Sequence, residues 1–447
     1  MQIRIPLRGW ACALALSIPA GLSCAAETLT LEQAIARAYA ANPSLRAVSH
    51  GVAIADAERE QAGALPNPEF SYLREGSDTR TVQVSQALEL GGKRGARIGV
   101  ADRQRQLAVD ALAVQRTALR ADVTAAYLDA LLASQRVELA QAELDLAAQA
   151  TSAASRRVAA GKISPIEQTR SSVAEAGARL ELTQASAALT LARRKLAALW
   201  AGKSDASPAA VASGQSAAVA TSAMLRGEST AIPAQLDAGA SPLPARRADE
   251  QLVAPALVEA QVPPLQELLA RLEDGPAIRH ARANVAHAEA QSKLERAKRV
   301  PDVTITLGSK REAADPSRSQ TVAGITIPLP LFDRNQGNVL AALRRADQAR
   351  DQLEAERLRQ REALAEAWQR ADVAQTQLAA IQQSVLPPAR EAYAASVKGF
   401  ELGKFSFLDV LDAQRTLFGA RAQFLTALSD RYRAIADLQR HIEGPAQ

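Results

Sequence analysis

Gly161-Lys162-Ile163-Ser164 and Gly403-Lys404-Phe405-Ser406 are two versions of one short motif, 242 positions apart in the chain. An earlier pair, Asn42-Pro43-Ser44-Leu45-Arg46 and Gly275-Pro276-Ala277-Ile278-Arg279, is 233 positions apart. Because these two separations are so similar, both halves carry the same segments in the same order. The sequence therefore predicts two structural repeats of one unit. A repeat of this size determines the architecture more strongly than any local motif does.

The composition favours long helices over ordinary globular domains. Of the 447 residues only 3% are aromatic, whereas 23% are charged, a mixture that suits helices with little deep core. The formal net charge is +5, and basic residues alternate with acidic ones, so the sequence lacks the footprint of a nucleic-acid-binding protein. It also lacks a nucleophile–base–acid grouping and a glycine-rich phosphate loop, so we expect a protein that is not an enzyme.

Residues 1–26 have the pattern of a secretion signal. Arg4 and Arg8 supply the charged region, an apolar stretch follows, and small residues offer a cleavage site near Ala26. Cys24 raises the alternative of a lipid-modified cysteine, but the usual Leu three positions earlier is missing. We expect ordinary cleavage, which leaves no cysteine for disulfides or thiolate metal sites. No other window approaches the roughly 20 apolar residues of a membrane-spanning helix.

We expect a first repeat over residues 27–202 and a second over 264–447. The joining segment, 203–263, is rich in Ala, Ser, Pro and Gly and has no sustained period, which predicts a flexible insertion of low complexity. Each repeat begins with a short amphipathic helix, over 29–39 or 265–272. An Asn-Pro or Gly-Pro break follows, and then a second helix that ends before a proline.

A change of period follows the second helix in each repeat. Val303, Ile305 and Leu307 alternate with polar residues, which is the two-residue period of a strand with one apolar face. The first repeat has a weaker version of the same alternation. We therefore predict strand pairs over about 68–90 and about 302–331, although an ordinary surface hairpin would have the same pattern.

Each repeat then continues as a long helical hairpin. Residues 100–160 contain neither Gly nor Pro, which predicts a helix of roughly 90 Å. Residues 338–386 form the equivalent stretch, which Pro387 interrupts. Each long helix ends at one copy of the Gly-Lys motif and returns through a second helix, over 166–200 or 408–443.

The predicted signal and the amphipathic strands together indicate the outer membrane of a Gram-negative cell. Only a closed barrel satisfies the backbone groups of strands in lipid. The four strands predicted here are too few for one chain to close a barrel, because the smallest usual barrels have about eight. Two chains would supply eight strands and three would supply twelve, and the residues alone leave both possibilities open.

Four segments carry a resemblance to a known family. Residues 386–393 (LPPAREAY) and 403–414 (GKFSFLDVLDAQ) are similar to the most recognisable stretch of the TolC family of outer-membrane efflux proteins. Residues 327–337 (IPLPLFDRNQG) and 88–94 (LELGGKR) resemble its heavy-metal resistance branch, which serves pumps of the cobalt–zinc–cadmium type. The resemblance covers nearly the whole chain apart from the signal and the insertion.

This resemblance implies a mainly α-helical chain with membrane β-strands, whose two repeats form a trimeric 12-stranded outer-membrane β-barrel continued by a long helical tunnel in the periplasm. The partners it implies are two further copies, a periplasmic adaptor, an inner-membrane cation–proton antiporter of the resistance–nodulation–division (RND) class and outer-membrane lipid. It implies a passive duct for divalent heavy-metal cations such as Co²⁺, Zn²⁺, Cd²⁺ and Ni²⁺, without a cofactor.

One alternative is the same duct exporting drugs or other small organic molecules. Another is a periplasmic adaptor, but adaptors carry β-rich domains around a single hairpin.

Three acidic residues are candidates for a periplasmic gate. Asp409 and Asp412 are three positions apart and would share one face of a helix, and Glu167 is the first-repeat counterpart of Asp409. In the family, acids at these positions point into the tunnel, so a trimer would stack carboxylate rings that favour cations. Crowding of like charges would raise some of their pKa values and make the constriction sensitive to pH and divalent ions. The alternative is a solvated acidic turn at a helix start, where carboxylates are favoured anyway.

The resemblance assigns the two hairpin tips to docking of the adaptor, although turn chemistry alone would also explain them. The residues assigned are Gly161, Lys162, Ser164, Gly403, Lys404 and Ser406. The chain departs from its relatives in one respect. A tyrosine and an arginine can hold the closed tunnel in relatives, whereas Phe400 and Phe405 occupy those places here. We therefore expect closure by apolar contact together with the acid rings.

A resident metal site is not expected. His280 and His287 are seven positions apart without a third ligand, and His50 and His441 stand alone. Apart from Met1, Met224 is the only methionine, so a methionine relay is absent, and the ligand spacing of zinc sites is missing as well.

Overall fold

The computed structural model describes residues 29–75, 79–200, 262–312, 318–402 and 404–442. The predicted signal with Cys24, almost all of the predicted insertion, and Gly403 lie outside the described residues.

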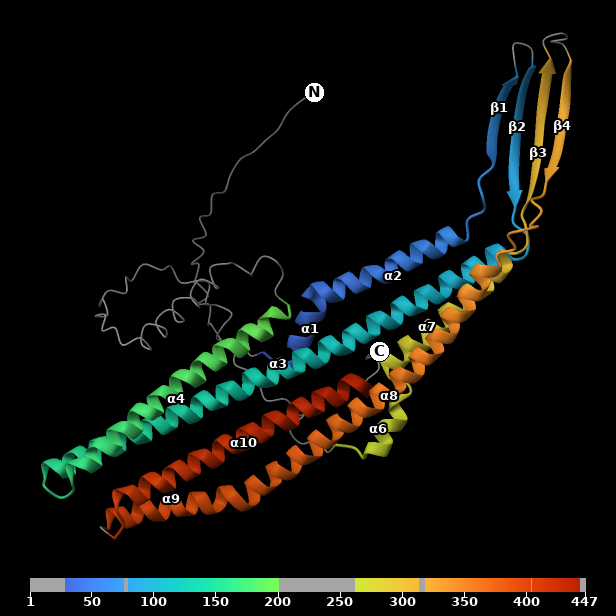
Figure 1. Cartoon of the computed structure of the whole chain (residues 1–447). Coiled ribbons are helices and arrows are strands. Elements are labelled where there is room, and N and C mark those ends of the chain that lie inside the picture. Colours follow the sequence, from blue (N-terminus) through green and yellow to red (C-terminus); the bar gives the residue numbers. More distant parts are fainter. Residues whose placement is uncertain (1–28, 76–78, 201–261, 313–317, 403, 443–447) are drawn as a thin grey trace, which may run out of the picture.

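The same order of elements occurs twice along the chain (Figure 1). The first repeat consists of α1 (Leu31–Ala41), α2 (Pro43–Ala62), β1 (Glu69–Glu75), β2 (Thr79–Leu88), α3 (Lys93–Ala159) and α4 (Pro165–Ala198). The second consists of α6 (Leu265–Leu272), α7 (Pro276–Ala297), β3 (Val303–Glu312), β4 (Ser319–Thr326), α8 (Gln336–Ala380), a π-helical segment (Ile381–Val385), α9 (Leu386–Glu401) and α10 (Phe407–Ile442). The expectation of a mainly helical chain with two strand pairs is therefore correct.

The molecule is long, with the strands at one end and the tips of both helical hairpins at the other (Figure 1). The 67 residues of α3 correspond to roughly 100 Å at 1.5 Å per residue. Helices α2 and α7 pack beside the sheet-proximal halves of α3 and α8. The helical part therefore holds the hairpin tips far from the sheet.

The breaks between the first two helices of each repeat have different local causes. Asn42 caps α2, since its Oδ1 accepts the Leu45 N–H at 3.0 Å and its Nδ2 donates to the Leu199 carbonyl at 2.8 Å. The equivalent position is Gly275, where a Cβ would lie 2.6 Å from the His441 carbonyl oxygen at the end of α10. A side chain is needed at the first break and excluded at the second.

Small residues at seven-residue spacing form the seam of the first hairpin. On α3 these are Ala140, Ala147 and Ala154, and on α4 they are Ser171, Ala178 and Ala185, all buried. The Ser171 hydroxyl lies 2.8 Å from the Thr151 hydroxyl across this seam. Because each contact position carries a small side chain, the two backbones approach closely, as in an antiparallel coiled coil.

The larger buried side chains gather where α1 and α6 meet the long helices. One cluster joins Leu31 of α1 to Tyr127 of α3 and Leu428 of α10, and the Tyr127 hydroxyl donates to the Leu29 carbonyl at 2.7 Å. A second cluster surrounds Leu364 of α8, with residues of α6, α7 and α10. Both short helices therefore anchor the middle of the molecule. Among the described residues, the structure contains no helix that combines the length and apolar character needed to cross a membrane.

Two predicted boundaries differ from the structure. The second strand pair was expected to reach residue 331, but β4 ends at Thr326, because Pro328 and Pro330 cannot donate ladder hydrogen bonds. Helix α3 begins at Lys93 rather than at residue 100, after Gly92 in the left-handed conformation (φ 70°).

Pro387 also fails to break the second long helix. It lies in the first turn of α9, directly after the π-helical segment, and α8 continues into α9 without a loop. A π-helical segment alters the hydrogen-bond ladder of a continuous helix, and such segments are among the usual places where a helix changes direction at a proline. The predicted interruption is therefore a local change of helix type.

Candidate functional site

One face of the four-stranded sheet is apolar and exposed. The antiparallel register places Phe70 of β1 opposite Val84 of β2, and Val84 opposite Leu307 of β3. Phe70 is 70% exposed and Leu307 59%. The opposite face is polar along the same strands, for example where Ser71 pairs with Gln83. Such a contiguous exposed apolar surface is unfavourable in water and suits a hydrocarbon environment.

The sheet is also open at both sides. The strand order is β1-β2-β3-β4, so within the described residues β1 and β4 each pair along one edge only. Unpaired edge groups are costly in lipid, where no water can satisfy them. Further strands must therefore cover both edges if the apolar face lies in a membrane.

The tip of the first hairpin is a tight turn between α3 and α4. Gly161 adopts φ 68°, a conformation that glycine takes at little cost. The Lys162 N–H donates to the Arg157 carbonyl at 2.9 Å, and Ser164 is the N-cap of α4, its hydroxyl accepting the Ile166 N–H at 3.4 Å. Lys162 and Ser164 are exposed, so the turn presents polar groups at the end of the molecule.

The tip of the second hairpin uses a capping box. The Asp409 carboxylate accepts the Ser406 N–H at 2.8 Å and the Ser406 hydroxyl at 2.9 Å. In return the Ser406 hydroxyl accepts the Asp409 N–H at 3.3 Å. The reciprocal arrangement is the one that usually starts a helix. Asp409 therefore has a local structural role in α10 besides any role of its charge.

The three predicted gate acids occupy equivalent helix starts but do not meet in one chain. Asp409 and Asp412 are exposed in the first two turns of α10, and Glu167 is half-buried in the first turn of α4. Asp412 lines an open cleft of about 700 Å³ between α4, α3 and α10, together with Ile166 and Arg415. Within the described part of the chain, none of the three acids forms an ion pair.

Glu143, a half-buried acid that the sequence pattern does not mark, lines the same cleft. Burial raises the pKa of Glu143 on α3, and the nearby carboxylate of Glu181 raises it further, whereas Arg415 lowers it. These three residues lie on α3, α4 and α10. No local pattern distinguishes Glu143 from the many other acids on the long helices.

Two aromatic side chains organise the second tip and link it to the first. Phe405 lies against Gly399, where an added Cβ would be 2.1 Å from the ring. The Arg157 guanidinium lies over the Phe400 ring, 3.8 Å from its centroid. A cation over an aromatic face is attracted by the ring quadrupole. The two tips are therefore linked through a charged residue, Arg157, that the sequence did not indicate.

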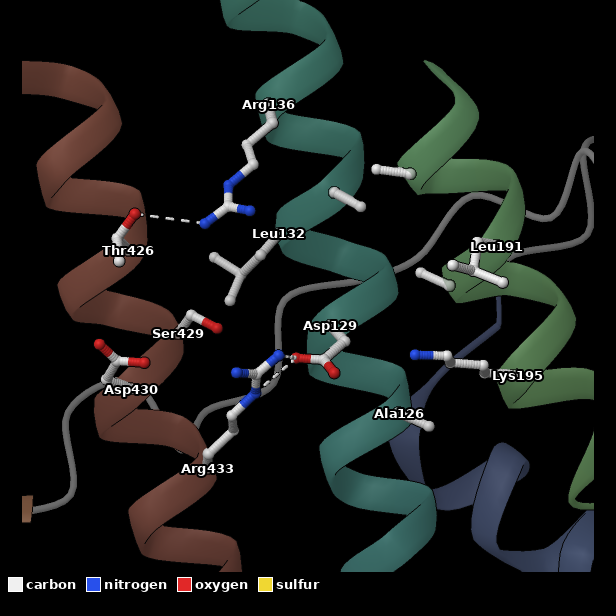
Figure 2. A pocket seen from close by; sticks show the side chains of 13 residues that line it. Ala126, Asp129, Leu132, Arg136, Leu191, Lys195, Thr426, Ser429, Asp430 and Arg433 are labelled. Carbon is white, nitrogen blue, oxygen red and sulfur yellow. Dashed lines mark hydrogen bonds and ion pairs between the residues drawn. The ribbon is translucent and has the colours of Figure 1, made fainter. Parts of the chain in front are cut away.

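Polar side chains fix the two repeats side by side further along the long helices. Figure 2 shows an open cleft of about 350 Å³ where α3 lies between α4 and α10. Asp129 of α3 accepts from Arg433 of α10 at 2.8 and 3.0 Å, and Arg136 of α3 donates to Thr426 of α10 at 3.3 Å (Figure 2). These contacts hold helices together.

The histidines have separate environments. His441 lies 2.6 Å from the Gln360 side-chain oxygen, and burial lowers the pKa of both His441 and His287. Among the described residues, no three His, Cys, Asp or Glu side chains form a group that could hold a metal ion.

An apolar-faced sheet with open edges, carried on two helical hairpins that reach far beyond it, defines the class: one protomer of an oligomeric membrane channel with a helical extension. More specifically, the chain belongs to the outer membrane efflux protein family, which matches residues 34–202 and 268–442.

Named relatives lie within this family. The cobalt-zinc-cadmium resistance protein CzcC of Cupriavidus metallidurans is 40% identical over 421 residues, which cover 93% of this chain and 90% of CzcC. The nickel-cobalt-cadmium resistance protein NccC of Alcaligenes xylosoxydans xylosoxydans is 29% identical, over 74% of this chain and 67% of NccC.

Solved structures of outer-membrane channels share the fold. CusC superposes with a TM-score of 0.66 at 19% identity, over 93% of this chain and 92% of CusC. VceC of Vibrio cholerae superposes with a TM-score of 0.68 at 18% identity, over 93% of this chain and 96% of VceC. These matches confirm the fold class expected from the sequence, a protomer of a trimeric barrel with a helical tunnel. The outer-membrane location follows from membership of the outer membrane efflux protein family. Family membership likewise confirms that the chain is a channel protein and not an enzyme.

Proposed function

We propose that this chain forms, as a homotrimer, the outer-membrane duct of a tripartite system that exports divalent heavy-metal cations. The observation that carries the proposal is the 40% identity to CzcC over 93% of the chain. Two further relatives, NccC and CnrC, are also named for resistance to nickel and cobalt. Three relatives named for metal resistance favour cations over drugs as the cargo of this chain.

The open sheet supports assembly as a trimer. Each chain supplies four strands with one unpaired edge on β1 and another on β4. Pairing of β1 in one chain with β4 in the next closes the ring without a free edge, and three chains give the twelve strands expected from the family. In this assembly the exposed apolar face, which includes Phe70 and Leu307, lies against lipid, and the polar face lines the pore.

The helical part then crosses the periplasm toward an adaptor and an inner-membrane RND cation–proton antiporter. We assign contact with the adaptor to the two tips, through Gly161, Lys162, Ser164, Gly403, Lys404 and Ser406. The exposed lysines and hydroxyls at the ends of the hairpins support this assignment. The duct itself needs no cofactor, because the antiporter supplies the energy.

Cation passage through the tips is assigned to the carboxylates of Asp409, Asp412 and Glu167. Three-fold symmetry turns each of them into a ring, and rings of carboxylates favour cations. The absence of an ion pair on any of the three within the described residues supports this role, since their charge is not neutralised within one chain. The two repeats, 27–202 and 264–447, each contribute one tip and one set of acids.

Growth of a deletion strain tests the cargo. The strain, with and without the restored gene, is exposed to graded Zn²⁺, Co²⁺, Cd²⁺ and Ni²⁺ and to a panel of antibiotics. The proposal predicts that sensitivity is confined to metals and that the gene restores tolerance. Sensitivity to antibiotics alone would assign the duct to drug export instead.

A further inference from the structure

The apolar row of the sheet continues beyond the last paired residue of β4. Ile325 lies on the exposed apolar face, and the alternate residues Leu329 and Leu331 remain exposed, at 75% and 65%. Phe332, which follows them, is 92% exposed. The intervening prolines keep this segment extended and cannot pair with another strand. An apolar ridge therefore projects from the junction between the sheet and the helices.

Cationic side chains lie beside this apolar ridge. Lys298, Arg299 and Arg334 line the same open cleft as Leu329 to Phe332, a cleft of about 530 Å³. Lys298 pairs with Glu295 at 2.7 Å. Within the described residues, by contrast, neither the Arg299 nor the Arg334 guanidinium has a carboxylate within ion-pair distance.

One carboxylate also lines the cleft. Asp333 accepts the Asn335 N–H at 2.8 Å, so it is engaged with the backbone of its own turn. Two guanidinium groups against this single carboxylate leave an excess positive charge at the cleft. The charge of the cleft therefore favours an anionic ligand.

The cleft is held in place by the fold. Asn335 adopts φ 57°, and its Nδ2 donates to the Glu295 carbonyl at 2.8 Å and to the Glu295 side chain at 2.9 Å. These bonds attach the start of α8 to the last turns of α7. The apolar ridge and the cations therefore stay together at the level where the membrane strands end and the helices begin.

We propose that this cleft binds an anionic phospholipid of the periplasmic leaflet. The acyl chains would lie along Leu329, Leu331 and Phe332, and the phosphate would accept hydrogen bonds from Arg299 and Arg334. Guanidinium groups suit phosphate because their planar donors match its oxygens. The inference rests on the outer-membrane location and is independent of the cargo.

A neighbouring chain is a weaker candidate for the occupant. In the proposed barrel the neighbour's β1 pairs with β4, whose paired residues end at Thr326. In the segment that follows β4, the first residue that lines the cleft is Pro328. Another strand cannot extend over the two prolines. The unpaired cations also match a phosphate better than they match an apolar contact between copies.

Lipid titration of the purified trimer tests the site. Native mass spectrometry would count the molecules of dioleoyl phosphatidylglycerol and of neutral dioleoyl phosphatidylcholine that remain bound. The wild type is expected to retain up to three phosphatidylglycerol molecules per trimer in preference to phosphatidylcholine. The double variant Arg299→Gln/Arg334→Gln should bind phosphatidylglycerol ~25-fold more weakly, because each cation near an anionic headgroup contributes to attachment.

Two further variants make the outcome decisive. Arg359→Gln/Arg390→Gln removes the same charge from exposed positions on α8 and α9 and should bind lipid as the wild type does. Phe332→Ser should weaken retention of both lipids. The proposal would be overturned by equal retention in both double variants, by displacement with inorganic phosphate alone, or by loss of the trimer in Arg299→Gln/Arg334→Gln. Metal tolerance of cells that carry the same variants is measured separately, because it tests the proposed export of metal cations and not lipid binding.

Discussion

The Arg157 guanidinium, in the last turn of α3, lies 3.8 Å from the centroid of the Phe400 ring in the last turn of α9. The contact joins the tip of the first hairpin to the tip of the second, at the end of the molecule farthest from the sheet (Figure 1). A cation–π pair at a half-buried site contributes about 0.5–2 kcal/mol. The pair therefore connects the two tips of one chain directly.

Phe400→Ala should loosen the tips and raise the conductance of the purified trimer in a planar bilayer. Loss of about 1 kcal/mol corresponds to a roughly fivefold larger population of the open form. Phe400→Tyr keeps the aromatic face and should conduct as the wild type does. Unchanged conductance in Phe400→Ala, or an equal rise in Phe400→Tyr, would show that the ring does not hold the tips closed.

Asp412→Asn should weaken block of the channel by divalent cations, because it removes one ring of three charges without removing a helix cap. The double variant Asp409→Ala/Asp412→Ala should weaken the block further and raise conductance. Ser406→Ala is the matched control for Asp409, since it breaks the same capping box and costs about 1 kcal/mol of helix stability while it keeps the charge. If Ser406→Ala reproduces the change in block, the capping box and not the acid ring controls cation passage.

Gly91 and Gly92 give a matched pair at the junction of sheet and helices. Both adopt φ 70°, but a Cβ on Gly91 would lie 2.7 Å from the Val300 side chain, whereas a Cβ on Gly92 would meet open space. Each alanine costs about 1 kcal/mol for the left-handed conformation, and Gly91→Ala should cost about 1–3 kcal/mol more through overpacking.

Heat dissociation of the trimer, followed on denaturing gels, would compare these two variants. Gly91→Ala is expected to dissociate at a clearly lower temperature than Gly92→Ala. Equal midpoints would mean that the structure accommodates a side chain at position 91 without overpacking against Val300.

Glu143→Gln should stabilise the protein near neutral pH. The folded protein raises the pKa of Glu143 by burial and by proximity to Glu181, so its ionised form is disfavoured in the folded state. The destabilisation is absent below the unfolded-state pKa, grows as pH rises toward the folded-state pKa, and is complete above it. The midpoint of thermal unfolding is therefore expected to rise at pH 7, and the rise should vanish under acidic conditions. Thermal unfolding at pH 7 and at acidic pH would measure both midpoints. An equal rise of the midpoint under both conditions would contradict this prediction.

The repeat, the strand pairs and the long hairpins were predictable because each depends on local periodicity. Alternation around Val303 defines a strand, and the Gly161 motif defines a turn, without knowledge of distant residues. The two prolines after Thr326 predict the end of β4, because proline cannot donate a ladder hydrogen bond. The apolar alternation continues through Leu331, however, and it favours a longer strand than the structure contains.

The contacts between repeats were not predictable, because they depend on how distant segments are placed. The register of β2 on β3, the Arg157–Phe400 pair and the proximity of Glu143 to Glu181 all join residues from different elements. Charged residues are common along the long helices, and the sequence pattern does not mark which of them meets a partner. The three predicted gate acids follow from the family pattern, whereas the capping contacts of Asp409 are visible only in the structure.

The most direct test of a metal duct is release of cargo from cells. A deletion strain that retains its pump and adaptor would be loaded with Zn²⁺, Co²⁺ or Cd²⁺, and in parallel with a fluorescent organic dye. The time course of release would then be measured with and without this chain. We predict that rapid metal release requires the chain and that dye release does not. Restoration of dye release without any change in metal release would contradict the proposed function.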